Sequence, residues 1–205
     1  MNYNLLLNNV QKIDSLLDIG CFAGNFSFFM EQNHNINKNK ILCIDINESY
    51  KETIESRGYR FIGTGLNSEK KIVPVYYPNN ACGLWDSRNT GVSYYKENTI
   101  HFEDCLVKYQ NVVPLDEIVI EETFDFVKID VQGAEYDVIL GGKNTLEKSK
   151  YILVETSCGD YNIGAKNEKE TIEILKSIGF QQKVILDEHI IDGILQQKDI
   201  LFEKV

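Results

Sequence analysis

The sequence predicts a doubly wound α/β fold, in which a mostly parallel sheet carries helices on both faces. Short apolar runs alternate with stretches of helical spacing, a glycine turn follows the first run, and acidic residues stand at the carboxyl ends of several runs. Strands that alternate with helices are typical of parallel sheets, and such sheets bind their ligands outside the carboxyl ends of the strands. We therefore expect a ligand site at that edge.

Composition indicates one globular domain over residues 1–205. The chain is 43% hydrophobic, which is enough for a sizeable core, and its formal net charge is −10 without any basic block. Binding to nucleic acid requires neutralisation of phosphates, so we expect no nucleic-acid partner. No run reaches the roughly 20 apolar residues of a membrane span. Since residues 1–4 also do not resemble a signal peptide, we expect a cytoplasmic protein with no membrane span.

The five cysteines are scattered and show no Cys-x-x-Cys spacing. They predict free thiols rather than a disulfide framework or a zinc site, and no other ligand spacing marks a metal site. The cysteines are Cys21, Cys43, Cys82, Cys105 and Cys158.

The first apolar run, residues 16–19, predicts a buried strand that is followed by a glycine turn and a helix. Gly20 and Gly24 let the backbone approach a bound molecule, and the helix N-terminus offers N–H groups to an anion. Asp18 suggests a cationic or hydroxyl-bearing group nearby. The spacing differs from the Gly-x-Gly-x-x-Gly of dinucleotide binders, so a pyrophosphate is not the first expected ligand. A turn that needs both glycines only for packing is the alternative.

The second and third strands are predicted at residues 41–46 and 59–62. Asp45 ends the second strand, where a carboxylate can accept hydrogen bonds from both hydroxyls of a ribose; a helix N-cap is the alternative. Asn67 and Ser68 follow the third strand and could reach an adenine edge, although a polar turn explains them equally well.

Residues 72–77 predict a strand that Pro74 confines to an edge, and residues 78–109 predict a long variable loop facing an acceptor. The aromatic residues of this loop could bind a sugar-like or aromatic substrate, or pack on one another as a lid. Of three isolated histidines, His34, His101 and His189, only His101 is a catalytic candidate. The aromatic residues are Trp85, Tyr94 and Tyr95.

The most informative stretch is a strand at residues 126–129 that leads into a helix over residues 133–142. Asp130 stands at the carboxyl end of the strand, and Glu135 lies in the first turn of the helix, where the dipole favours it. Lys128, in mid-strand, needs a buried partner. Further along the chain we expect strands at 151–155, 183–186 and 199–203 and a helix at 169–177.

These residues resemble the FkbM-type S-adenosylmethionine-dependent methyltransferases. Leu115-Asp116-Glu117, the segment from Lys128 to Glu135 and Ile139-Leu140-Gly141-Gly142 match the family's motifs, with Gln132 where the family usually has glutamate. Asp18-Ile19-Gly20 with Gly24 looks like the family's cofactor turn. The resemblance implies a seven-stranded Rossmann-like class I methyltransferase fold whose last strand is antiparallel.

The same resemblance implies S-adenosylmethionine as cofactor and O-methylation of a sugar or glycan hydroxyl. The expected cofactor-binding residues are Asp18, Gly20, Gly24, Asp45, Asn67 and Ser68. The expected catalytic residues are Asp130 as base or orienting group, Glu155 second, Lys128 as ion-pair partner, and Glu135. An ion pair that only ties the strands together is the alternative.

Two other functions are weighed against methyl transfer. A catalytically inactive nucleoside-binding module of the same fold is suggested by Gln132 alone. A nicotinamide-dependent oxidoreductase would need the three-glycine turn, which this chain lacks. We expect a small-molecule or glycan acceptor as partner, and a homodimer could complete the acceptor site.

Overall fold

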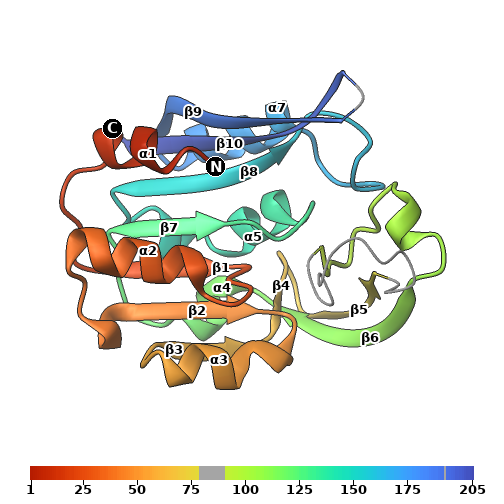
Figure 1. The fold of residues 1–205 in the computed structure, drawn as a ribbon, viewed down its shortest axis with the longest axis horizontal. Helices are drawn as coiled ribbons and strands as arrows, with labels where there is room; N and C mark the ends of the chain where they lie inside the picture. The colour runs from red at the N-terminus through yellow and green to blue at the C-terminus, as the bar shows by residue number, and fades with distance from the viewer. Residues whose placement is uncertain (79–90, 192) are drawn as a thin grey trace.

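The computed structural model describes residues 1–78, 91–191 and 193–205, which form two sheets (Figure 1). The larger sheet has seven strands in the order β3-β2-β1-β7-β8-β10-β9, and every pairing is parallel except those of β10 with β8 and β9. This confirms the predicted doubly wound fold with its antiparallel last strand. The strands are β1 (Leu16–Ile19), β2 (Ile41–Asp45), β3 (Arg60–Gly63), β7 (Phe126–Ile129), β8 (Tyr151–Ser157), β9 (Phe180–Ile191) and β10 (Ile194–Lys204).

Helices cover both faces of the large sheet because successive strand side chains point to opposite sides. Leu16 packs with residues of α1, α2 and α3, whereas Leu17 and Ile19 pack with residues of α4 to α7. The helix α7 begins with a capping box between Asn167 and Glu170. The helices are α1 (Tyr3–Asn9), α2 (Asn25–His34), α3 (Lys51–Ser56), α4 (Leu115–Ile118), α5 (Glu135–Gly141), α6 (Lys143–Leu146) and α7 (Glu168–Ser177), with short 3-10 turns at Lys38–Lys40, Glu48–Tyr50 and Ile100–Phe102.

The smaller sheet has the order β4-β6-β5 and lies beyond the carboxyl ends of β1 and β2 (Figure 1). Its buried side chains Val73, Val75 and Val112 form a separate apolar cluster that Ile46 joins. The predicted edge strand is present as β5, and Pro74 is tolerated there because, among the described residues, the outer side of β5 forms a bridge at Tyr76, with Ser93, and none at Pro74. The strands are β4 (Gly65–Leu66), β5 (Lys71–Tyr77) and β6 (Leu106–Val113).

Several predicted element boundaries were wrong. The loop predicted over residues 78–109 is shorter, because residues 106–109 belong to β6 and pair with β5. The apolar spacing of residues 3–13 favours a helix over that range, but α1 ends at Asn9, because Val10 turns to an extended conformation and packs into the core. The hairpin of β9 and β10 extends past its apolar residues, since the two strands satisfy each other's backbone groups. Trp85 and Cys82 lie outside the described residues.

Within the described parts of the chain, no helix is long and apolar enough to cross a membrane.

Candidate active site

A cavity of about 260 Å³ opens at the carboxyl ends of β1, β2 and β7. Gly20, Asp45 and Asp130 line it together, so three residues far apart in the sequence meet at the predicted edge. Tyr94, from the segment after residue 90, closes one side.

Gly20 cannot be replaced without moving the backbone of β7. Its φ is +74°, and a Cβ at this position would stand 1.7 Å from the carbonyl oxygen of Asp130. The glycine therefore allows the two strand ends to lie together at the cavity. Gly24 also has a left-handed φ, but it starts α2 and does not line the cavity.

Asp45 is held by two backbone donors. Its Oδ2 accepts from the N–H of Phe22 at 3.0 Å and its Oδ1 accepts from the N–H of Asn47 at 2.9 Å. Burial raises the pKa of Asp45 to about 6, although these hydrogen bonds oppose the shift. Each carboxylate oxygen keeps acceptor capacity for a further donor, such as a ribose hydroxyl.

Phe22 is a cavity residue that the sequence analysis missed. It adopts a left-handed conformation with φ of 49°, which is uncommon for a bulky side chain. Its ring packs edge-on against Tyr50 at 5.1 Å between centroids, and both rings line the cavity. An aromatic residue within the glycine turn was the only available signal.

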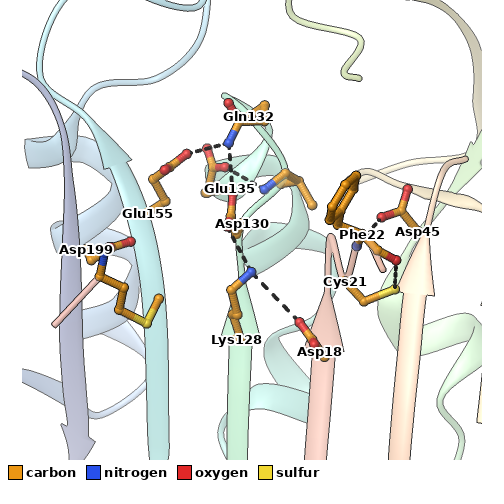
Figure 2. Close-up of polar contacts among 12 residues, drawn as sticks. Asp18, Cys21, Phe22, Asp45, Lys128, Asp130, Gln132, Glu135, Glu155 and Asp199 are labelled. Carbon is orange, nitrogen blue, oxygen red and sulfur yellow. Dashed lines mark hydrogen bonds and ion pairs between the residues drawn. The ribbon is translucent and has the colours of Figure 1, made fainter. Parts of the chain in front are cut away.

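Lys128 has the buried partners that its position in mid-strand requires. Its Nζ lies 2.9 Å from Oδ2 of Asp130 and 3.9 Å from Oδ1 of Asp18 (Figure 2). Asp18 is fully buried and also accepts a 2.6 Å hydrogen bond from Ser27. Asp18 and Lys128 do not line the cavity. Lys128 contacts Asp130, which does line it, so Lys128 positions Asp130, and Asp18 is the second partner of Lys128. Burial alone would raise the pKa of Asp130, but Lys128 holds it below its usual value.

Gln132 bridges the two acids that were expected to act in catalysis. Its Nε2 donates to Oδ1 of Asp130 at 2.9 Å and to Oε2 of Glu155 at 2.7 Å (Figure 2). Burial, followed by the charge of Asp130, raises the pKa of Glu155 well above its usual value. The surroundings thus move the pKa values of the two acids apart, down for Asp130 and up for Glu155. An ionised glutamate at position 132 could not donate these hydrogen bonds.

Glu135 shapes the loop between β7 and α5. Its Oε1 accepts from the N–H of Val131 at 2.9 Å and its Oε2 from the N–H of Gly133 at 3.0 Å. Burial raises its pKa to about 7. Because this buried side chain does not line the cavity, we assign it a positioning role.

Asn67 and Ser68 also lie away from the cavity wall, which Thr64, Gly65 and Leu66 form in their place. Asn67 is fully buried and donates to the hydroxyl of Tyr94 at 3.0 Å. It therefore supports a cavity residue rather than facing the cavity itself.

The predicted aromatic pair is fixed to α5 by Tyr95 and to β4 by Tyr94. The hydroxyl of Tyr95 donates to Asp137 at 2.7 Å, and that of Tyr94 donates to the carbonyl of Leu66 at 3.0 Å. His101 does not line this cavity. Among the residues that the structure describes, no group of three or more His, Cys, Asp or Glu could hold a metal ion.

Replacement of Gln132 by methionine is expected to lower the free energy of unfolding by about 1–3 kcal/mol, because two buried acceptors lose a donor.

A Gln132→Glu variant should be destabilised most at pH 8 and approach the wild type at pH 5, where a protonated glutamic acid can donate again. Thermal unfolding at both pH values measures the difference from the wild type. Gln181→Glu, at an exposed position, is the control. Equal destabilisation by Gln132→Glu at both pH values would contradict the bridging role.

Comparison with solved structures identifies the fold. The magnesium protoporphyrin IX methyltransferase of Synechocystis PCC 6803, solved with bound SAM, aligns with a TM-score of 0.55 and 9% identity over 99% of this chain and 75% of that one. The methyltransferase FkbM of Methylobacillus flagellatus KT aligns with a TM-score of 0.55 and 16% identity, covering 93% of this chain but 43% of that one. This chain thus spans less than half the length of that FkbM protein.

Comparison of sequences identifies the family. A segment of 56 residues is 41% identical to the 2-O-methyltransferase NoeI of Sinorhizobium fredii, but it covers 27% of this chain and 23% of NoeI. The family model described as the methyltransferase FkbM domain matches residues 18–182, which include Gly20, Asp45, Asp130 and Glu155. The match spans most of the chain, so the chain belongs to the FkbM methyltransferase family.

Proposed function

We propose that the protein is an O-methyltransferase that uses S-adenosylmethionine to methylate a sugar hydroxyl. The observation that supports this most directly is the cavity shared by Gly20, Asp45 and the ionised Asp130, in a chain of the FkbM family. Transfer to a hydroxyl oxygen is supported by the partial match to NoeI, a 2-O-methyltransferase, and the sugar is the acceptor that the resemblance in sequence implies.

The cavity residues fit this cofactor. Asp45 retains acceptor positions for the hydroxyls of a ribose, and Gly20 leaves room for a bound molecule against the backbone. Ile46, Leu66 and the ring of Tyr50 provide apolar surface for a base. When bound, S-adenosylmethionine supplies an electrophilic methyl group.

The chain's own part in the reaction is to orient the acceptor hydroxyl and to take its proton. Asp130 is ionised, lines the cavity and can accept a hydrogen bond from that hydroxyl. Attack of the hydroxyl on the methyl group, with S-adenosylhomocysteine as leaving group, would make the proton on the hydroxyl oxygen strongly acidic, so a carboxylate of low pKa would suffice as base. Lys128 keeps Asp130 ionised, and Gln132 fixes its orientation.

Calorimetric titration with S-adenosylmethionine, S-adenosylhomocysteine and NAD tests the proposed cofactor. We expect binding of both sulfur nucleosides and none of NAD. Asp45→Ala should weaken binding at least about tenfold, or roughly 1.4 kcal/mol, whereas Asp14→Ala at an exposed site should leave it unchanged. If neither nucleoside binds, the methyltransferase proposal is wrong. Binding without turnover on any hydroxyl acceptor would favour the inactive binding module.

The affinity for the cofactor should fall as the pH is lowered through about 6, where Asp45 gains a proton. A neutral carboxyl group accepts weaker hydrogen bonds from hydroxyls than a carboxylate does. Titrations between pH 5 and 8 should therefore show a decline in the wild type and a flatter profile in Asp45→Asn. An identical pH profile in the two proteins would show that Asp45 is not the titrating group.

A further inference from the structure

The segment of residues 91–98, called the strap below, runs from the cofactor cavity to the loop that follows β8. Its first four residues line the cavity. Its last three pair with the loop over residues 158–165 (Figure 1). The strap therefore connects a wall of the cofactor cavity to the loop at the carboxyl end of the strand that carries Glu155.

The strap and the loop satisfy each other's polar groups. The N–H of Asn98 donates to the carbonyl of Tyr161 at 2.7 Å, and a second backbone bond of 2.9 Å runs from the loop to the strap. The hydroxyl of Tyr161 also donates to Oε2 of Glu97 at 3.1 Å, and Glu97 is buried. The second backbone bond joins the N–H of Ile163 to the carbonyl of Lys96. The position of the loop therefore depends on the position of the strap.

The hydroxyl group of Tyr94 fastens the cavity end of the strap to β4. It donates to the carbonyl of Leu66 at 3.0 Å and accepts a hydrogen bond of 3.0 Å from Nδ2 of Asn67. Leu66 lines the cavity beside Tyr94, and Asn67 is fully buried behind them. A ligand in the cavity would thus lie against a part of the strap that this hydroxyl holds in place.

The strap and the loop also pack on the turn that orients the acid pair. A Cβ at Gly133 would stand 2.6 Å from Cβ of Asn162 in the loop and 3.1 Å from Cβ of Tyr95 in the strap. The residue before Gly133 is Gln132, whose side chain donates to both acids (Figure 2). The placement of the strap and the loop therefore affects the surroundings of Asp130.

These contacts predict that a ligand in the cofactor cavity stabilises the loop. A segment opens locally when its hydrogen bonds break, and a ligand that binds the closed form suppresses this opening. The strap carries the contacts with the ligand at one end and the hydrogen bonds to the loop at the other. Such coupling is reciprocal, so a weaker contact between loop and strap must also weaken binding of the ligand.

We infer that Tyr94 is a positioning residue that couples the cofactor cavity to the loop over residues 158–165. The inference rests on the proposed methyltransferase function, because the ligand is its cofactor. Binding of the cofactor holds the strap in place, and the strap in turn holds the loop beside the acid pair. The protein around Asp130 and Glu155 is thus fully ordered only after the cofactor has bound.

Hydrogen exchange of single amides, followed by NMR with and without saturating S-adenosylhomocysteine, tests this inference. In the wild type the ligand should slow exchange of the Asn98 and Ile163 amides at least about tenfold. In Tyr94→Phe, which keeps the ring and loses the hydroxyl, it should slow them less than about threefold at saturation. The amide of Lys204, which donates to the carbonyl of Lys150, should not change in either protein.

Two further tyrosine variants complete the test. Tyr109→Phe is the matched control, because Tyr109 is 75% exposed and belongs to neither the strap nor the cavity wall, and it should behave as the wild type does. Tyr161→Phe removes the hydroxyl that bonds Glu97, at a residue that does not line the cofactor cavity. It should weaken binding of S-adenosylhomocysteine at least about threefold in calorimetric titration.

The outcomes separate this inference from the proposed function. If the wild type binds the nucleoside and the two amides exchange as before, or if Tyr94→Phe shows the full slowing, the coupling is overturned and the proposed function stands. Unchanged nucleoside affinity in Tyr161→Phe also overturns the coupling. If the wild type does not bind the nucleoside, the proposed function fails and the coupling with it.

Discussion

Replacement of Lys128 by methionine is expected to lower the free energy of unfolding by about 3–5 kcal/mol, because removal of one partner leaves buried carboxylates without their cation. Lys128 is buried between Asp130 at 2.9 Å and Asp18 at 3.9 Å, and methionine keeps much of its length. For a domain of this size the melting temperature should fall by about 6–20 °C. Differential scanning calorimetry measures both quantities.

The pH dependence of this effect has a defined sign. In the wild type the pKa of Asp130 is lowered, so its ion pair stabilises the fold above the unfolded pKa of about 3.9 and the contribution is lost below it. Without Lys128 burial raises the pKa of Asp130, and the folded variant binds an extra proton. The difference in the free energy of unfolding between Lys128→Met and the wild type should therefore become smaller as the pH is lowered from 8 to 5.

Two further variants control for this prediction. Lys166→Met breaks an exposed pair with Glu170, which solvent screens, and should destabilise the protein far less than Lys128→Met. The double variant Lys128→Met/Asp130→Asn should recover part of the loss, since both partners of the closer pair are then uncharged. If Lys128→Met lowers the free energy of unfolding by less than about 1 kcal/mol, the ion pair of Lys128 and Asp130 does not contribute to folding as expected.

Replacement of Gly20 by alanine is expected to destabilise the protein by about 2–5 kcal/mol. About 1–2 kcal/mol comes from an alanine in the left-handed region, and about 1–3 kcal/mol from overpacking. The new Cβ would meet the Asp130 carbonyl at 1.7 Å, so β1 and β7 must separate where they form the cavity. We therefore also expect loss of binding to S-adenosylmethionine, measured by calorimetric titration.

Gly193→Ala is the matched control for Gly20→Ala. Gly193 has a similar φ of +77°, but a Cβ there would meet nothing within 4 Å. Gly193→Ala should therefore lower the free energy of unfolding only by the conformational strain of about 1–2 kcal/mol and leave binding of S-adenosylmethionine unchanged. If the two variants lose equal stability and both bind the cofactor, close packing at Gly20 is not what shapes the cavity.

Local patterns in the sequence were sufficient to predict the fold and the edge at which the cavity opens. Short apolar runs alternate with helical spacing, and this alternation is a property of neighbouring residues. Asp45, Asp130 and Glu155 each follow or end such a run, and parallel strands bring their carboxyl ends to one edge. Gly20 and Lys128 were also identified from sequence, because a glycine turn and a mid-strand lysine are visible without any contact.

The role of each residue depended on contacts between distant segments, which only the tertiary structure defines. Asp18 faces Lys128 and Ser27 inside the protein, although its position in the sequence equally suited a cofactor ligand. The smaller sheet arises from pairing of β5 with β6 across a long connection, which no local pattern predicts. The pKa of Asp130 is lowered by the nearby cation Lys128, whereas burial raises the pKa of Glu155. These are properties of the surroundings of a side chain, not of its residue type.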